Sequence, residues 1–442
     1  AQLASRAGAL LAVLTASAND AQRLLDEIPY FAPQLRVRLL PAWETLPYDN
    51  FSPHHDLVSE RLATLYSVLR GECDVLLVPA STACYRLAPP AYLAAYTFFF
   101  KKGEKLDADA LRAQFTLAGY SHVTQVVAPG EYSVRGGLVD LFPMGSAQPY
   151  RLDLFDDEIE SIKAFDVDTQ RTLFPVPEIR LLPAREFPLD ERGRAHFRQR
   201  FRERFEGDPA RSGIYKDVSN GSAPAGIEYW LPLFFDETAT LFDYLPRNAV
   251  LCLHNDVPEA IRAFWRDAQA RHAMLNGERS RPLLPPDDLF LAEEPFFVAA
   301  KPYARLVLER GEGGPAGSLP PVAVARRADD PLGNLKAFVG SFPGRILVLA
   351  ESAGRRETLA ELFAEYGLKP TPGDGLAAFL AGKEKLCLGV SPLLDGFQLH
   401  AAAGEAGPFA FVTEAELYAG SPTRRTRRAA QRRATLDNWR RA

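Results

Sequence analysis

Short apolar segments alternate with amphipathic segments along the first hundred residues, and this alternation limits the possible fold more than any other feature. Residues 75–80 form an unbroken apolar run, which is typical of a strand in a parallel sheet covered on both faces. Residues 57–69 carry apolar side chains at three- and four-residue spacings, which predicts an amphipathic helix. A strand over 10–14, a helix over 20–28 and a strand over 35–40 precede it. The chain is therefore predicted to be an α/β protein that begins with a doubly wound parallel sheet.

The pattern then changes. Between residues 97 and 183 strand-like segments follow one another, and a single helix-like segment at 108–118 interrupts them. The alternation of strand and helix returns beyond this region, beginning with an apolar strand at 250–253. We predict that residues 184–300 complete the sheet begun in residues 1–96, and that residues 97–183 form an inserted α+β lobe. The predicted strands of the lobe are 97–101, 123–127, 137–142, 150–155 and 159–165.

A stretch rich in glycine and proline follows this part of the chain. Residues 311–321 contain four glycines and three prolines, a composition typical of a linker. We predict a linker over 301–330 and, because strand and helix patterns resume after it, a small separate α/β domain over 331–420. The remaining residues, 421–442, are predicted to be a basic linker tail.

The net charge of -5 conceals an uneven distribution of charge. The last twenty residues hold eight arginines and one acid, a balance of +7, so the other 422 residues carry -12. An acidic body is a poor general binder of nucleic acid. Two interpretations of the tail stay open at this point: its arginines contact phosphates, or they belong to a solvated linker.

Composition also excludes several classes of protein. No segment approaches the ~20 apolar residues that a membrane-spanning helix requires. The four cysteines stand far apart without a C-x-x-C motif, which argues against a disulfide scaffold or a zinc ribbon and favours the cytoplasm. The apolar run 7–14 resembles a short secretory signal, but a buried strand agrees better with the helix predicted after it. Because the sequence starts at Ala1 and not at Met, we expect a trimmed or partial chain.

The sequence contains no positive sign of catalysis. No phosphate-binding loop of the form G-x-x-x-x-G-K-[ST] occurs in it. An ATPase of this fold also needs a pair of acids at the end of an apolar strand to hold Mg²⁺. The candidate strand 250–253 is followed by His254, Asn255 and Asp256, which supply a single displaced carboxylate. We therefore expect no catalytic residues, no metal ligands and no cofactor in this chain.

The predicted strand at 150–155 has the composition of a protein-binding surface. Side chains alternate across a strand, so Leu152 and Leu154 can enter the core while Arg151 and Phe155 point the other way. A large aromatic beside an arginine on a solvent face is typical of a binding hot spot. Arg135 precedes the neighbouring strand and is expected to lie across the sheet from Arg151. The alternative is that Phe155 packs under a loop and the arginines are merely solvated.

Several sequence blocks resemble the family of bacterial transcription-repair coupling factors, known as Mfd. The resemblance is close over about 40–290 and looser beyond it. The blocks include 43–49 (WETLPYD), 140–145 (DLFPMG), 149–153 (PYRLD), 165–168 (FDVD), 224–230 (PAGIEYW) and 281–286 (RPLLPP).

This resemblance implies both a fold and a function. The N-terminal module of the family is similar to the excision-repair protein UvrB, with a helicase-like domain split by an inserted lobe. In the family this lobe is the docking surface for UvrA. The contact residues of the family match Arg135, Arg151 and Phe155, so the resemblance favours the binding-surface interpretation of these residues.

The chain also departs from UvrB, which binds ATP and grips damaged DNA. The Walker B acid pair of UvrB aligns with His254 and Asn255, so this position is degenerate. The damage-gripping hairpin has no room between Tyr48 and Leu57, and the Walker A position falls before Ala1. The resemblance thus implies a UvrA-recruiting module without enzyme activity. The alternative is a DNA-binding or ATP-binding helicase-like module.

The resemblance implies further partners only for the full-length parent. In the family the chain continues into an RNA-polymerase-binding domain and an ATP-driven translocase of double-stranded DNA. ATP and Mg²⁺ are expected to act in those domains and not in the 442 residues of this chain. A membrane partner is not expected.

Overall fold

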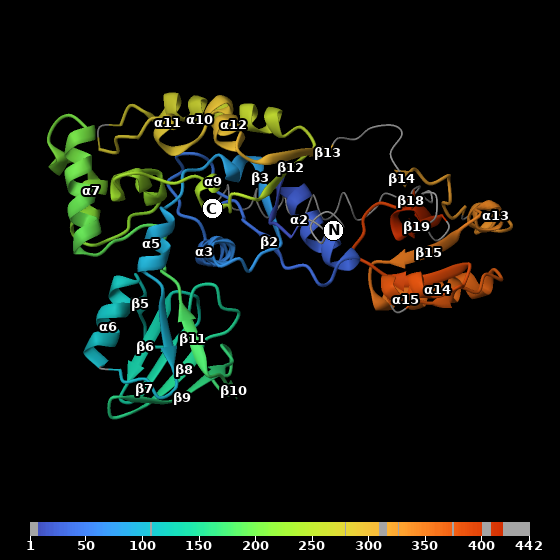
Figure 1. Cartoon of the computed structure of the whole chain (residues 1–442), viewed down its shortest axis with the longest axis horizontal. Coiled ribbons are helices and arrows are strands. Elements are labelled where there is room, and N and C mark those ends of the chain that lie inside the picture. Colours follow the sequence, from blue (N-terminus) through green and yellow to red (C-terminus); the bar gives the residue numbers. More distant parts are fainter. Residues whose placement is uncertain are drawn as a thin grey trace. The chain divides into compact units, whose positions relative to one another are not determined.

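The computed structural model describes residues 8–106, 108–278, 280–308, 316–325, 327–373, 375–399 and 408–418 (Figure 1). The chain divides into two compact units, each of which is described by itself. The first unit comprises Ala1–Leu25 and Leu35–Glu309, and the second comprises Asp26–Gln34 and Arg310–Ala442.

A five-stranded parallel sheet forms the centre of the first unit, with the strand order β13-β12-β1-β3-β2. All five residues of β1 and all five of β3 are buried, as expected for unbroken apolar runs at the centre of a covered sheet. The strand β12 comes from the chain after the lobe and pairs with β1, which comes from the chain before it. The strands are β1 (Leu11–Thr15), β2 (Val37–Leu39), β3 (Val75–Pro79), β12 (Val250–His254) and β13 (Ala304–Leu308).

Helices cover both sides of this sheet, with α10, α11 and α12 on one side and α3 on the other (Figure 1). The amphipathic pattern of α3 buries Val58, Leu62 and Leu65, as its spacing predicts. The helices around the sheet are α2 (Ala18–Phe31), α3 (His55–Leu69), α4 (Ala80–Ala83), α5 (Pro90–Ala95), α9 (Leu241–Tyr244), α10 (Val257–Leu275), α11 (Pro286–Leu289) and α12 (Glu293–Ala300).

An aromatic core lies beside the sheet, around the segment that follows the lobe. It includes Trp43, Phe197, Phe201 and Trp230, all buried. The helices that enclose it are α7 (Glu191–Arg204), α8 (Gly213–Ser219) and the 3₁₀ segments η1 (Pro209–Arg211) and η2 (Ile227–Phe234).

A buried ion pair joins α3 to the segment that follows the lobe. Arg61 Nε donates to Glu186 Oε1 at 2.6 Å, and the side chains are only 1% and 6% exposed. Trp43 Nε1 donates to the other oxygen of Glu186 at 3.1 Å, and Arg61 Nη1 donates to the carbonyl of Pro41 at 2.7 Å. These bonds compensate both charges, as burial of an ion pair requires.

The lobe is built on a six-stranded sheet with the order β10-β9-β8-β7-β6-β5. Only β5 and β6 run parallel, and the other neighbours are antiparallel. Helix α6 (Ala108–Leu117) contributes Leu111 and Phe115 to the core under one face of the sheet. A two-stranded sheet, β4 (Phe98–Lys101) with β11 (Glu178–Leu181), joins the lobe to the rest of the unit. The remaining strands are β5 (Ser121–His122), β6 (Glu131–Arg135), β7 (Leu138–Leu141), β8 (Tyr150–Phe155), β9 (Glu158–Phe165) and β10 (Thr172–Pro175).

A tight turn of the lobe rests directly on α3. The backbone N–H of Gly145 donates to Ser59 Oγ at 2.7 Å. Gly145 has φ +78°, and a Cβ at this position would lie 2.8 Å from the Cβ of Ala63. Only glycine combines this left-handed conformation with so close an approach.

The second unit is a smaller α/β structure with the strand order β14-β18-β19-β15-β17-β16. Four of its strands run parallel, and β18 and β14 extend the sheet in antiparallel fashion. Phe31, from the last turn of α2, belongs to this unit and packs against Phe397 and Phe411. The strands are β14 (Ala316–Gly317), β15 (Arg345–Ala350), β16 (Thr371–Pro372), β17 (Leu386–Val390), β18 (Phe397–Leu399) and β19 (Phe409–Thr413). The helices are α13 (Gly333–Ser341), α14 (Ala353–Glu365), α15 (Leu376–Ala381) and α16 (Glu414–Leu417).

The α/β class with a parallel sheet is confirmed, but two expectations need correction. The expected strand at 123–127 is a loop: Val126 packs on Phe142 and Phe165, while the Glu131 carboxylate accepts bonds from the backbone of the loop's end. The expected linker over 301–330 contains β13, whose apolar residues extend the first sheet beyond residue 300. Residues 309–315 and 326 of that linker and the whole tail, 421–442, lie outside the described residues.

Candidate functional site

Strand β8 presents its polar and aromatic side chains on the face of the sheet opposite the core. Leu152 is fully buried and Leu154 packs against the core, as alternation predicts. Arg151 and Phe155 lie on the other face, where Phe155 is 70% exposed. The exposed ring excludes the alternative in which Phe155 packs under a loop.

The two arginines meet on a buried carboxylate, that of Asp140 in strand β7. Arg151 Nε donates to Asp140 Oδ1 at 2.6 Å, and Arg151 Nη2 donates to Oδ2 at 2.9 Å. Arg135 Nη2 donates to the same Oδ2 at 2.5 Å. The Asp140 side chain is only 1% exposed, so both of its oxygens are occupied inside the sheet.

This arrangement confirms that Arg135 neighbours Arg151 across the sheet, although the two strands that carry them are not adjacent. Strand β7 stands between β6 and β8, and in this register Asp140 is the partner of Arg151. Sequence reasoning gave Asp140 no role. The available signal was a single acid within the otherwise apolar stretch 138–142.

Arg151 is further enclosed by its surroundings. Its guanidinium lies 5.1 Å from the centre of the Phe165 ring, and its Nη1 donates to the carbonyl of Gln170 at 3.4 Å. The hydrogen bonds to Asp140 raise the pKa of the Arg151 guanidinium above its already high ordinary value. The Arg151 side chain is 18% exposed, whereas that of Arg135 is 53% exposed.

A second charged pair lies on the same face and includes Asp153, two positions after Arg151 along β8. Lys163 Nζ donates to Asp153 Oδ2 at 2.8 Å, and Ser161 Oγ donates to the same oxygen. Partial burial acts against ionisation of Asp153, but these two hydrogen bonds prevail and lower its pKa. The carboxylate is thus ionised and compensated at neutral pH.

Two turns bring Phe155 to the edge of this face. The β8–β9 hairpin turns at Asp156, which has φ +54° and lies between the strands expected at 150–155 and 159–165. The neighbouring β6–β7 turn consists of Gly136 and Gly137, and the Gly137 carbonyl accepts a bond from the N–H of Leu154 at 2.7 Å. Since glycines carry no side chain, nothing on that turn shields the Phe155 ring.

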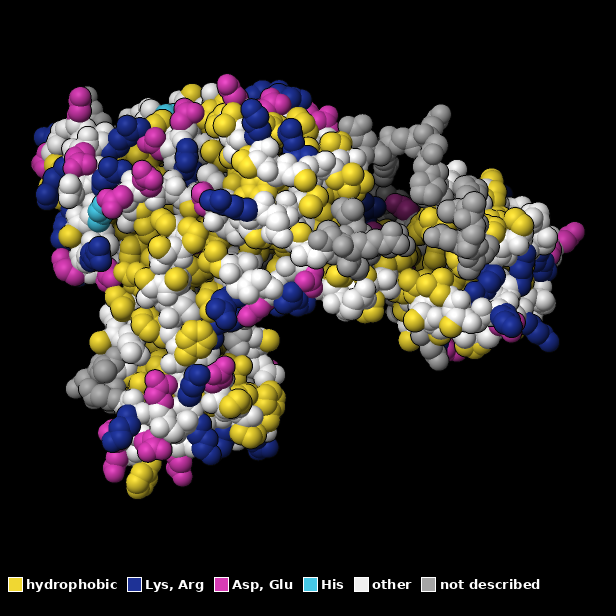
Figure 2. Space-filling view, in the orientation of Figure 1, with side chains coloured by type: hydrophobic (Ala, Val, Ile, Leu, Met, Phe, Trp, Pro, Cys, Tyr) yellow, Lys and Arg dark blue, Asp and Glu magenta, His cyan; other side chains and the backbone are white. Residues whose placement is uncertain are grey.

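Leu138 completes the surface. It is 39% exposed and pairs in register with Arg135 on one side and with Asp153 on the other. We call this surface the β7–β8 face; it consists of Arg135, Leu138, Asp140, Arg151, Asp153, Phe155 and Lys163. On the visible side of the lobe, charges of both signs lie among exposed hydrophobic side chains (Figure 2).

The position aligned with a Walker B acid pair lies at the end of β12. Asn255 has φ +64°, and its Nδ2 lies 3.3 Å from Asp20 Oδ2 and 3.2 Å from His254 Nδ1. The carboxylate of Asp256 caps α10 by accepting from the N–H of Glu259 at 3.0 Å. An imidazole and an amide do not make the carboxylate-rich site that Mg²⁺ prefers. Within the described residues, no group of three or more His, Cys, Asp or Glu side chains could hold a metal ion.

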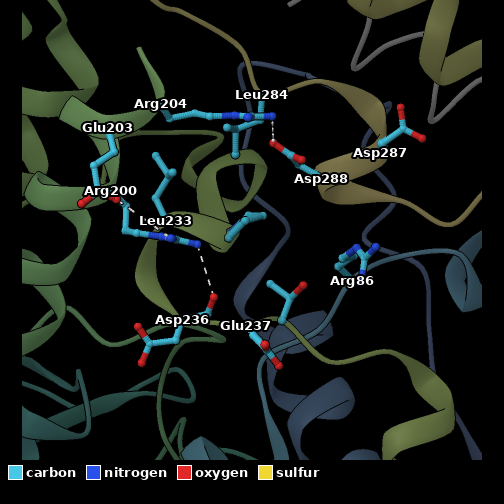
Figure 3. Close-up of a pocket in the computed structure, with 12 residues that line it drawn as sticks. Arg86, Arg200, Glu203, Arg204, Leu233, Asp236, Glu237, Leu284, Asp287 and Asp288 are labelled. Atoms are coloured by element: carbon cyan, nitrogen blue, oxygen red, sulfur yellow. Dashed lines mark hydrogen bonds and ion pairs between the residues drawn. The ribbon is translucent and has the colours of Figure 1, made fainter.

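A pocket of about 550 Å³ lies beside α7 and has mixed charge (Figure 3). Arg204 Nη2 is 2.6 Å from Asp288 Oδ2, and Arg200 Nη2 donates to the carbonyl of Asp236 at 3.3 Å. Glu203, Glu237 and Asp287 also line it. The lining holds three arginines and five acids, a net charge of -2, so the pocket does not favour an anionic ligand such as a nucleotide phosphate.

Two family models match parts of the chain. The model described as "UvrB interaction domain" matches residues 98–187, the region that contains the β7–β8 face. The model described as "MFD, D3 domain" matches residues 338–417, within the second unit. In the described parts of the chain, none of the helices has the length and apolar character that crossing a bilayer requires.

The chain is also similar to curated proteins along most of its length. The transcription-repair-coupling factor of Haemophilus influenzae is 42% identical over 420 residues, which cover 92% of this chain and 36% of that protein. That of Escherichia coli is 43% identical over 379 residues, 84% of this chain and 33% of the relative. That of Myxococcus xanthus is 33% identical over 315 residues, 66% of this chain and 26% of that relative. The chain spans about a third of the length of the first two relatives.

Proposed function

Because the chain belongs to the family of transcription-repair coupling factors and corresponds to their N-terminal part, we propose that it is a module that recruits UvrA. The lobe docks UvrA through the β7–β8 face. In the full-length protein this module links RNA polymerase stalled on double-stranded DNA to nucleotide excision repair.

The single observation that carries this proposal is the exposed Phe155 ring on the same face of the sheet as an anchored pair of arginines. Phe155, at the end of β8 beside the hairpin turn, leaves 70% of its surface exposed and so available to a partner. Aromatic and arginine side chains on a preformed surface make up most binding hot spots. The match of the lobe to a family model described as "UvrB interaction domain" supports a partner from the excision-repair machinery.

The chemistry of the face indicates how UvrA is bound. Phe155 fills an apolar pocket on UvrA, and the arginine pair, chiefly through the more exposed Arg135, faces a carboxylate there. The module itself does not hydrolyse ATP, because His254 and Asn255 stand where a Mg²⁺-binding acid pair would be needed. ATP and Mg²⁺ act in the translocase domains of the full-length parent.

A calorimetric titration of purified UvrA into this chain tests the proposal. If UvrA covers the exposed part of the Phe155 ring, roughly 140 Å², removal of the ring lowers the binding free energy by about 3 kcal/mol. This corresponds to about 100-fold in affinity. Phe155→Ala should therefore bind about 100-fold more weakly, with unchanged thermal unfolding because the ring is exposed. Phe51→Ala is the matched control, since Phe51 is also 70% exposed but lies outside the lobe.

The outcomes separate the proposal from its alternative. Binding by the wild type and by Phe51→Ala, but not by Phe155→Ala, supports docking through the β7–β8 face. Equal affinity for both variants overturns that face. Absence of binding by the wild type overturns the recruiting function, and titrations with ATP and with duplex DNA then test a helicase-like module.

A further inference from the structure

We propose that Asp140 is the positioning residue of the β7–β8 face, because it holds Arg135 in the orientation in which this side chain meets the partner. Asp140 itself does not touch the partner. This inference rests on the proposed docking of UvrA and assigns a role to a residue that the docking proposal does not use.

Burial and bonding show that Asp140 works from within the sheet. Its side chain is 1% exposed, and its two oxygens accept three hydrogen bonds from the two arginines. Asp140 lies in β7, between the strands that carry Arg135 and Arg151. A charge in this place is stable only because it is paired, so the carboxylate and the two guanidinium groups constrain one another.

Arg151 has few donors left for a partner. Its Nε and Nη2 bind Asp140, its Nη1 binds the carbonyl of Gln170, and one face of its guanidinium lies against Phe165. With an exposed fraction of 18%, it serves mainly to fix the carboxylate. The bidentate geometry is one that lysine cannot reproduce.

Arg135 is held by Asp140 through one nitrogen of its guanidinium, and much of its side chain is exposed to solvent. A single bond, from Nη2 to Asp140, is its only hydrogen bond to the described residues, and 53% of its side chain is exposed. Two arginines and one aspartate leave a local charge of +1, while Lys163 and Asp153 compensate each other. The face therefore presents one oriented cation beside Leu138, which suits a carboxylate on the partner's surface.

Because Asp140 orients the Arg135 side chain before the partner arrives, the partner binds more tightly. A free arginine loses rotamer freedom when it is immobilised at an interface, whereas an anchored one has already lost it. Asp140→Asn keeps the shape of the side chain but removes the charge that attracts both arginines. We expect UvrA to bind this variant about 10-fold more weakly, a change of about 1.4 kcal/mol.

The test is a double-mutant cycle measured by titration with UvrA. If Asp140 acts through Arg135, Asp140→Asn should weaken binding about 10-fold in the wild type but less than about 2-fold in an Arg135→Ala background. In that background Asp140 stays paired with Arg151, so the lobe keeps its structure. A purely structural effect of Asp140→Asn would weaken binding equally in both backgrounds and overturn the inference.

A second cycle excludes a general distortion of the face. Phe155→Leu keeps an apolar side chain four positions from Arg151, roughly 13 Å along the strand. The loss caused by Asp140→Asn should be the same with Phe155 or Leu at that position; a coupling as strong as that with Arg135 would contradict the inference. Failure of the wild type to bind UvrA would instead overturn the docking function together with this inference, and the wild-type titration alone reveals it.

Discussion

Glu228 should make the stability of the first unit fall as the pH rises. This carboxyl group lies at the start of η2, where Ser52 Oγ donates to its Oε2 at 2.8 Å. Burial, and to a smaller extent nearby Glu186, raises its pKa to about 7, although the bond from Ser52 acts in the opposite direction. The ordinary value for the unfolded chain is 4.5.

The sign and size of the effect follow from linkage between protonation and folding. The folded pKa is raised, so the contribution of Glu228 is complete below the unfolded pKa and is lost as the pH rises through the folded value. The full loss is about 3.4 kcal/mol, of which about 2 kcal/mol falls between about pH 5.5 and about pH 8. Glu228→Gln removes this titration while keeping an acceptor for Ser52.

Urea unfolding of both proteins at the two pH values measures the effect. The buried indoles Trp43 and Trp230 report on the first unit through their fluorescence. We expect Glu228→Gln to gain about 2 kcal/mol relative to the wild type on going from about pH 5.5 to about pH 8. The exposed Glu237→Gln serves as control and should show no such gain. An equal pH dependence of the wild type and Glu228→Gln would refute the reasoning.

Three further variants probe other contacts of the first unit. Gly145→Ala should destabilise the first unit by about 1–3 kcal/mol in urea unfolding, because its Cβ would strike α3; unaltered stability would contradict this close packing. Leu138→Ala should weaken UvrA binding about 5-fold without loss of stability, whereas Leu173→Ala, on the edge strand of the same lobe, should bind like the wild type. Arg61→Met should cost about 3–5 kcal/mol of stability, since it leaves the Glu186 charge buried without its partner, and adding Glu186→Gln should recover part of the loss.

Local patterns were sufficient to place a strand where turn residues bound a clear run of apolar or alternating residues. The bounds expected for β8 agree with the structure, because Pro149 and Asp156 flank the alternating run. The orientation of Phe155 also followed from simple alternation. These features depend on neighbours in the sequence, so the sequence alone could predict them.

Features that depend on pairing between distant segments could not be predicted in this way. Alternation places Asp140 on the polar face of its strand, but it does not show that arginines from two other strands enclose it. No helix pattern in the sequence before β13 indicated that a further strand would follow. Only its pairing with β12 makes β13 part of the first sheet. The expected strand at 123–127 was wrong because Val126 lies in a loop and is nevertheless buried. A count of apolar residues cannot distinguish a buried loop from a strand.

Amide hydrogen exchange of this chain with and without UvrA would locate the docking surface without any substitution. We predict that UvrA slows exchange in residues 135–141 and 152–158, around the two turns that flank Phe155, and that Phe155→Ala abolishes this protection. Protection confined to the second unit or to α7, with exchange in the lobe unchanged, would show that UvrA binds elsewhere and would contradict docking through the β7–β8 face.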